Sequence, residues 1–132
     1  MPLGFFRDFA VSDAGDHRNT FDLKAGGIAA LVQMARLFAL ARGINAVGTA
    51  ARFRAASAAG GLSAENADNL IEAFHFIQHV RLAHQARQIR AGQEPDNHVN
   101  PAELTGLEKR QLRDAFEIVR KMQGALGHVY QT

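Results

Sequence analysis

The chain has 132 residues, of which 47% are hydrophobic and 21% are charged, and its formal net charge is +2. This length and composition are typical of one globular domain and exclude a disordered tail or a pair of full domains. The absence of cysteine excludes disulfides, thiolate catalysis and cysteine-ligated metal, and it favours a cytoplasmic location.

Neither a membrane span nor a signal peptide is predicted. The longest apolar run, Ile28 to Ala41, is too short to cross a bilayer and is interrupted by Gln33 and Arg36. Charged residues directly follow the short aromatic run near the start, which is unlike a signal peptide. We therefore expect a soluble protein with no membrane partner.

The first two dozen residues have the pattern of a β-hairpin. Residues 5–11 contain a β-prone run, residues 12–16 have turn chemistry, and residues 20–23 form the predicted returning strand. An isolated hairpin is only marginally stable in water. We expect this one to complete either the rest of the domain or a sheet outside this chain.

Two helices are predicted in the next part of the chain. The first opens at Gly26 and Gly27, runs to about Ala41 and is apolar almost all round, which is typical of a helix buried on most sides. A shorter helix follows from Thr49, its predicted N-cap, to Ala59.

The longest predicted helix, residues 64–91, begins after the N-cap residue Ser63 and is closed by Gly92. Residues 93–101 cannot form regular helix, because each proline in this segment restricts the residue before it.

The last predicted helix begins at a capping box, Thr105 with Glu108, and its amphipathic stripe extends to about residue 129. The predicted fold is therefore all-α, an up-and-down bundle of three long helices and one short helix, with a short N-terminal β-hairpin.

One face of the long helix changes from apolar to polar. Leu70, Phe74 and Ile77 share a stripe on a helical projection. The next residues along this stripe form what we call the polar cluster: Arg81, His84, Gln85 and Gln88. A buried polar group that stays unpaired costs about 1–3 kcal/mol, so these side chains require partners.

Two interpretations of the polar cluster remain open. It forms an internal hydrogen-bond network, with Arg81 paired to Asp96, Asp114 or Glu117, or it forms a pocket for an anionic or amide-bearing group. Arginine and glutamine supply the fork-like donors that such a pocket needs, and Arg36 is a potential neighbour.

No catalytic or metal-binding residue is predicted. His75 and His79 have a spacing that can hold zinc, but no HExxH pattern is present and a solvated face explains them better. His17, His98 and His128 belong to no recognisable ligand set. The sequence also contains no phosphate loop, no nucleophile elbow and no pair of acids on a strand.

Residues along nearly the whole chain match one known family in order and spacing: Pro2–Arg7, Asp22–Lys24, Ala35–Arg36, Ala39–Leu40, Gly43–Ile44, Thr49, Arg52, Arg81–Leu82, His84–Gln85, Gly92, Pro95–Asn97, Pro101 and Leu104. On these residues the chain resembles the putative nucleotidyltransferase substrate-binding domain.

The resemblance implies that this chain is the C-terminal part of a longer bacterial protein. In such proteins, cyclic-nucleotide-binding and CBS modules precede a nucleotidyltransferase-like domain, which is similar to that of uridylyltransferases acting on the PII nitrogen-signalling protein. The metal-binding carboxylates of that domain, in a Gly-Ser…Asp-x-Asp arrangement, are absent from this sequence. The resemblance thus implies Mg²⁺ and a nucleoside triphosphate for the parent protein and no cofactor for this chain.

The resemblance also implies a division of the chain and a set of site residues. Residues 1–24 would join the missing catalytic domain, with Asp22 and Lys24 near the interface, and residues 25–132 would be the substrate-binding domain. The residues expected to contact substrate are Arg36, Thr49, Arg52, Arg81, His84 and Gln85, with Gln88 added from the polar cluster. Asp96 and Asn97 match the family too, but turn formation explains them equally well.

Two functions follow as hypotheses. The first is a helical module without chemistry of its own, which positions an acceptor, including a protein acceptor, or a nucleotide for the upstream domain. The second is a structural or regulatory interaction module that relays the state of upstream sensor modules or forms a homodimer, suggested by the aromatic run of residues 5–9 and the amphipathic last helix. Nucleic acid is not an expected partner, because no clustered arginine face is visible in the helical projections.

Overall fold

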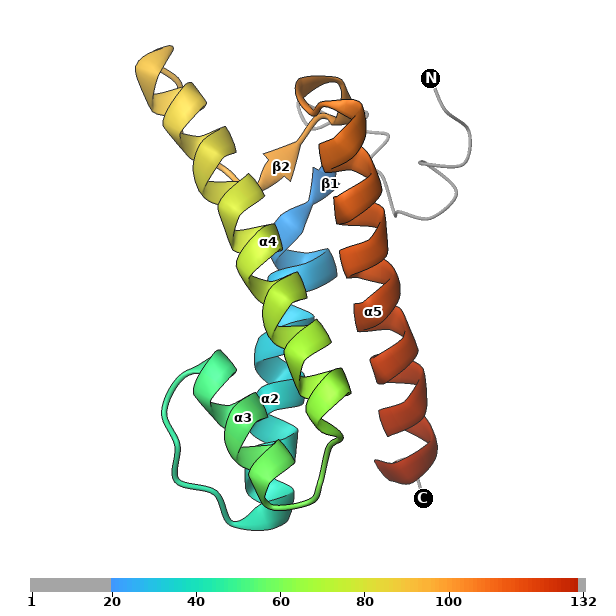
Figure 1. Ribbon diagram of the computed structural model, residues 1–132. Coiled ribbons are helices and arrows are strands. Elements are labelled where there is room, and N and C mark those ends of the chain that lie inside the picture. The colour runs from blue at the N-terminus through green and yellow to red at the C-terminus, as the bar shows by residue number, and fades with distance from the viewer. Residues whose placement is uncertain (1–19, 131–132) are drawn as a thin grey trace.

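The computed structural model describes residues 20–130, without the side chains of Phe21 and residues 127–130. Four helices pack together in it (Figure 1): α2 (Ala29–Arg42), α3 (Thr49–Ala58), α4 (Ala64–Arg90) and α5 (Gly106–Tyr130). Four short elements complete the described chain: β1 (Phe21–Asp22), the π-helix η2 (Lys24–Ile28), β2 (His98–Val99) and the 3₁₀-helix η3 (Pro101–Glu103). The prediction of an all-α fold with three long helices and one short helix is confirmed.

The first two helices depart from strict up-and-down alternation. The Arg42 Nη1 atom, at the end of α2, donates a hydrogen bond of 3.3 Å to the carbonyl of Ala59, just after the end of α3. Both helices therefore end at the same end of the bundle. Figure 1 shows the loop between them running back along the bundle before α3 begins. The sequence predicted an up-and-down bundle, but residues 43–48 are enough extended chain to span a short helix, so α3 can run in the same direction as α2.

The predicted hairpin is wrong in its pairing. Its first strand, within residues 5–11, lies outside the described residues, but its returning strand pairs elsewhere. Phe21 is opposite Val99 and Asp22 is opposite His98 in an antiparallel pair, and the Leu23 N–H donates to the Asn97 carbonyl at 2.8 Å. Leu23 and Val99 are both fully buried. This pairing therefore removes two apolar side chains from water, which favours it over a local hairpin.

The core runs the length of the bundle and draws on every helix. Its largest fully buried side chains are Leu23, Leu31, Phe53, Leu70, Ile77, Val80, Val99, Leu112 and Val119. The predicted division between residues 1–24 and the rest of the chain stays a prediction, but Leu23 already belongs to this core.

Helix ends follow the capping signals of the sequence with one exception. Ser63 Oγ accepts from the Asn66 N–H at 3.0 Å, and Thr105 and Glu108 exchange both hydrogen bonds of a capping box. The exception is α3, whose N-cap is Gly48 rather than Thr49 and supplies no side-chain cap. Gly48 has a φ of 96°, a conformation that favours glycine and shifts the cap by one residue.

Two glycines allow η2 to pack closely between α4 and α5. A Cβ atom added to Gly27 would lie 2.9 Å from Ile77 Cδ1 and 3.3 Å from Phe116 Cζ, and one added to Gly26 would lie 2.9 Å from Phe116 Cε1. The pair was predicted as a helix start, but its main role is therefore steric.

The stretch Lys24–Arg42, which joins η2 to α2, is long and apolar enough to cross a membrane by length and composition alone. In the bundle, 39% of its most apolar 18-residue segment is buried. Core helices of globular proteins can have the same length and composition as a membrane-spanning helix. Leu31, Ala35 and Phe38 of this stretch belong to the hydrophobic core.

We expect Gly27→Ala to destabilise the fold. Overpacking costs about 1–3 kcal/mol, and the gain in helix propensity returns only about 1 kcal/mol. Urea unfolding measures the difference. The matched control is Gly124→Ala in α5, where an added Cβ meets no atom within 4 Å. It should stabilise the chain by about 0.5–1 kcal/mol, and an equal gain in both variants would contradict the steric role of Gly27.

Candidate functional site

The polar cluster lies on the last turns of α4 and faces the loop that leads to α5. In Figure 1 this part of α4 is at the upper end of the bundle, beside β2. The side chain of His84 is buried, and those of Arg81, Gln85 and Gln88 are half-buried. All four form hydrogen bonds within the chain.

His84 is held between two carboxylates from this loop. With only 4% of its surface exposed, its Nε2 atom lies 2.8 Å from Asp96 Oδ1 and its Nδ1 atom 2.9 Å from Glu103 Oε2. Only the doubly protonated ring can donate to both oxygens, because either neutral tautomer has one N–H. We call His84, Asp96 and Glu103 the carboxylate clamp.

The rest of the polar cluster fixes the same loop. Arg81 Nε donates to Asn97 Oδ1 at 2.6 Å, and Gln85 Nε2 donates to the same oxygen at 3.2 Å and to the Asp96 carbonyl at 3.1 Å. Gln88 Oε1 accepts from the Asp96 N–H at 2.8 Å. Arg81 is therefore paired to Asn97 and not to any of the three acids predicted for it.

Both carboxyls of the clamp have lowered pKa values. Partial burial raises the pKa of Asp96, but hydrogen bonds from His84, the His98 N–H and Gln88, with the charge of His84, outweigh burial and bring it below its ordinary value. Burial likewise raises the pKa of Glu103, and hydrogen bonds from His84, Arg87 and the Asn100 N–H lower it further than burial raises it.

Glu103 was not among the residues predicted from the sequence for this cluster. Its second oxygen accepts from the Asn100 N–H, while Asn100 Oδ1 accepts from the Ala102 N–H, so Glu103 is also part of a capping box on η3. The sequence signal was available, because an asparagine followed three residues later by a glutamate is a capping pattern.

Arg36 and Arg52, the other predicted cations, do not join the polar cluster. They line a hollow of about 290 Å³ between α2 and α3, with Ala39, Leu40 and Ile44. Arg52 is half-buried and its Nε donates to the Ala46 carbonyl at 3.1 Å. Arg36 is exposed and has no ion-pair partner among the described residues. Thr49, one turn before Arg52, is half-buried beside this hollow without lining it.

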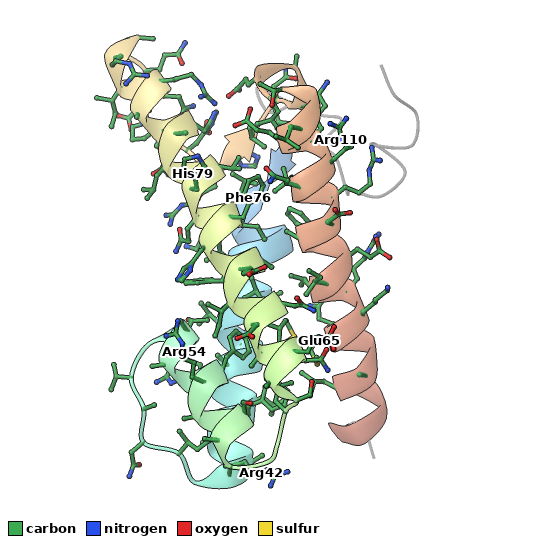
Figure 2. All side chains as sticks on the ribbon, in the orientation of Figure 1. Arg42, Arg54, Glu65, Phe76, His79 and Arg110 are labelled. Carbon is green, nitrogen blue, oxygen red and sulfur yellow. The ribbon has the colours of Figure 1, made fainter. Side chains whose placement is uncertain are left out.

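A second feature was missed because each helix was considered alone. Residues 23–64 contain no acidic residue, and their five basic residues give this stretch a charge of +5: Lys24, Arg36, Arg42, Arg52 and Arg54. We call residues 24–62 the basic helix pair. Figure 2 shows Arg42 and Arg54 at the lower end of the bundle, away from the polar cluster.

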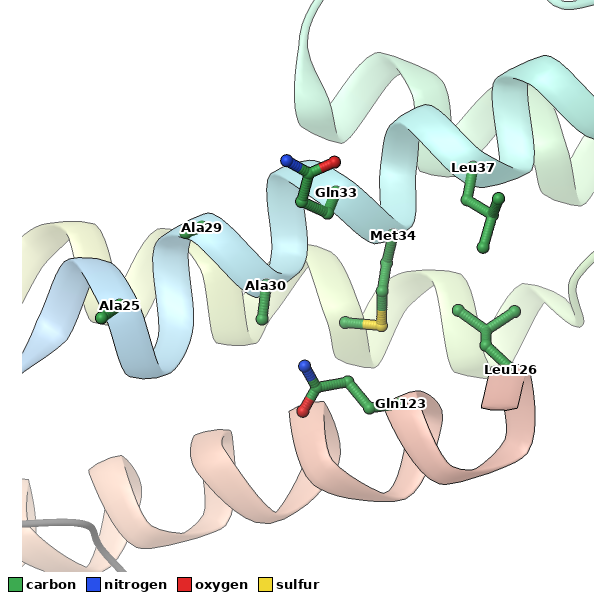
Figure 3. Close-up of a pocket in the computed structure, with 8 residues that line it drawn as sticks. All are labelled: Ala25, Ala29, Ala30, Gln33, Met34, Leu37, Gln123 and Leu126. Atoms are coloured by element: carbon green, nitrogen blue, oxygen red, sulfur yellow. The ribbon is translucent and has the colours of Figure 1, made fainter. Parts of the chain in front are cut away.

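A larger hollow, of about 410 Å³, lies between α2 and α5. Figure 3 shows Met34 and Leu126 pointing into it from the two helices. Its lining has two glutamines and no charged residue: Ala25, Ala29, Ala30, Gln33, Met34, Leu37, Gln123 and Leu126. A hollow of this composition suits an apolar group rather than a phosphate.

The remaining predicted residues have simpler surroundings. Asp22 Oδ1 accepts from the N–H groups of Lys24 and Ala25 at 2.9 and 3.1 Å, so it caps the start of η2. Lys24, His75 and His79 are exposed. No group of three or more histidine, aspartate or glutamate side chains in the described part of the chain could hold a metal ion. The interdomain role of Asp22 and Lys24 stays a prediction.

Comparison with known proteins gives one match. A model of the family described as putative nucleotidyltransferase substrate binding domain matches residues 1–130. No curated protein and no solved structure matches the chain.

We expect His84→Ala to lower the free energy of unfolding by about 2 kcal/mol, because it removes two hydrogen bonds to charged groups and leaves two carboxylates facing each other. Urea unfolding measures this loss, and limited proteolysis should cut residues 93–103 faster. His79→Ala, on the exposed side of the same helix, is the control and should change stability by less than about 0.5 kcal/mol. Equal stability of the two variants would exclude a stabilising role for the clamp.

The carboxylate clamp should also make the free energy of unfolding depend on pH in the acidic range. The pKa values of Asp96 and Glu103 are lower in the folded chain than in the unfolded chain, so their contribution is complete only above about pH 5 and is lost as the pH falls through the lowered folded values. Urea unfolding at several pH values checks this. The variant Asp96→Asn/Glu103→Gln should lose less stability between about pH 5 and pH 3; a loss as large as that of the unmodified chain would contradict the prediction.

Proposed function

The chain belongs to the putative nucleotidyltransferase substrate-binding domain family, and from this membership we propose that its substrate-contacting surface is the basic helix pair, centred on the hollow between Arg36 and Arg52. Membership implies association with a nucleotidyltransferase domain. The proposed role is to hold the anionic part of the acceptor or of the nucleotide while that domain transfers the nucleotidyl group.

The distribution of cations carries this proposal. A guanidinium binds a phosphate or carboxylate through paired hydrogen bonds, and arginine suits this task because its fork of donors is rigid. Arg52 is held in place by the Ala46 carbonyl, while Arg36 is exposed and unpaired among the described residues. With no carboxylate between Asp22 and Glu65, nothing within this stretch competes for these donors.

The polar cluster is a weaker candidate for the substrate-contacting surface. Arg81, His84, Gln85 and Gln88 already bind the loop that follows α4. A ligand there would have to replace those hydrogen bonds, and leaving a buried polar group unpaired is costly. A substrate role for these four residues therefore remains the weaker part of the prediction.

The chemistry of nucleotidyl transfer determines which interactions such a surface must provide. In nucleotidyl transfer the acceptor attacks the α-phosphorus of a nucleoside triphosphate and pyrophosphate leaves. Metal ions held by the carboxylates of the catalytic domain supply most of the charge stabilisation in such reactions. Orientation of the reactants by a second domain lowers the barrier further. In a parent protein of the uridylyltransferase-like signalling type, with CBS and cyclic-nucleotide-binding modules, Arg36 and Arg52 would orient a phosphate or an acidic acceptor surface.

The second candidate function is a structural or regulatory module. It is favoured by the carboxylate clamp, which uses the most polar surface of α4 to fix β2 and, through it, β1. In this alternative, the state of upstream modules would reach the bundle through β1, and the basic helix pair would bind a partner surface rather than a substrate.

We expect the isolated chain to bind nucleoside triphosphates weakly, with a Kd of about 0.1–1 mM, as expected for a few charge-assisted hydrogen bonds in an open hollow. Calorimetric titration at low salt measures this. Arg36→Ala and Arg52→Ala should each weaken binding by roughly tenfold. Arg110→Ala, an exposed arginine on α5, is the matched control and should bind as the unmodified chain does.

Arg81→Ala separates the two predicted regions. Loss of binding in this variant together with unchanged binding in Arg36→Ala would move the site to the polar cluster. Equal binding by all four variants would exclude both regions as the site for a nucleotide.

A further inference from the structure

The outward face of α4 carries a seam that no element of the described chain covers. Positions that recur at alternating spacings of three and four lie along this face, and the last three of them are apolar, as in a helix that packs against another helix. These positions are Glu72, His75, His79, Leu82, Ala86 and Ile89; all are exposed except Ala86, which is half-buried. The core stripe of α4, with Leu70, Ile77 and Val80, lies on the opposite side.

The seam exposes two large apolar side chains. Leu82 is 60% exposed and Ile89 is 63% exposed, and they are one heptad apart on the same side of the helix. In Figure 1 the last turns of α4 extend past β2 and away from α5. A second helix could therefore reach the last turns of α4 without meeting α5, whereas at the other end of the seam Glu72 lines a hollow that α4 shares with α5.

Charge along this face is divided between its two ends. Its first half carries Glu65, Asp68 and Glu72 and no basic residue, and its last turns carry Arg87 and Arg90 and no acidic residue. Arg87 is paired to Glu103 at 3.0 Å. Glu72 and Arg90 have no ion-pair partner among the described residues.

This separation of acidic and basic residues along α4 favours antiparallel pairing of two copies. Glu72 and Arg90 are each nine residues from Arg81, and their separation of 18 positions is about five turns, so both lie on the same line along the helix. In an antiparallel pair with a two-fold axis near Arg81, Glu72 therefore lies opposite Arg90 of the partner subunit, and the symmetry repeats this contact. Parallel pairing would instead place like charges together.

We propose that two copies of this chain associate through the outward faces of their α4 helices, antiparallel, with the Leu82 side chains packed at the two-fold axis and Glu72–Arg90 ion pairs on either side. The contact spans about 27 Å along each helix, from the helical rise. An interface made by one helix from each copy is small and belongs to the weak, reversible class. A nucleotidyltransferase domain is the rival occupant of the same face.

Sedimentation equilibrium of the chain from about 10 µM to about 1 mM tests the pairing, because weak dimers form in this range. We expect the average mass to rise from 14.3 kDa toward twice this value. Glu72→Arg and Arg90→Glu should each weaken association by roughly tenfold, since each replaces two attractive contacts with repulsive ones. The double variant Glu72→Arg/Arg90→Glu should restore it.

Two further variants test whether association depends on the α4 seam. Leu82→Glu should abolish association, while Leu107→Glu, at a 58% exposed leucine outside the seam, should not change it. Circular dichroism of each variant confirms that the helices are intact. A chain that stays monomeric at about 1 mM would overturn the proposal and leave the face to a different domain. Association that survives the single reversals, or that the double reversal fails to restore, would overturn the antiparallel arrangement.

Discussion

A single buried imidazole determines the arrangement of one end of this molecule. His84 lies between the carboxylates of Asp96 and Glu103, and these two residues are on either side of β2 in the segment between α4 and α5. Burying a polar ring is unfavourable unless its nitrogen atoms are hydrogen-bonded. The segment is therefore held against α4 at two points, and what lies between them, including β2, has little freedom of position.

The contacts of His84 also fix, through β2, the position of the first described residues. Asp96 accepts from the His98 N–H, which sets the direction of β2, and β2 pairs with β1. Leu23 then enters the core directly after β1, and η2 packs against α4 and α5 through its glycines. The polar residues of α4 therefore act mainly on the architecture, while Arg36 and Arg52, the cations of the proposed site, are on α2 and α3.

Local signals in the sequence predicted most of the helical fold, because capping residues and glycines act over a few neighbouring residues. Ser63, Gly92 and the pair Thr105 and Glu108 mark helix ends in the sequence and in the structure alike. The strand pairing was not predictable in the same way. Hairpin patterns describe neighbours in sequence, whereas the partner of β1 is determined by the loop that His84 holds.

The candidate site was predicted only in part, for a related reason. A helical projection shows that His84 faces inward and needs partners, but it cannot identify Asp96 and Glu103 as those partners. A helical projection also considers α2 and α3 one at a time and does not show the contacts between them. The shared charge of residues 23–64 can be counted from the sequence, but the hollow that brings Arg36 and Arg52 together cannot be predicted from either helix alone.

The pairing of β1 with β2 has a consequence for the order of folding during synthesis. Contacts within α2, α3 and the first half of α4 join residues close in sequence and can form as soon as those residues leave the ribosome. Leu23, by contrast, has no hydrogen-bond acceptor until Asn97 has been made. Its pairing with the loop before β2 is therefore a late event, because the Leu23 N–H lacks this acceptor until residue 97 has been made.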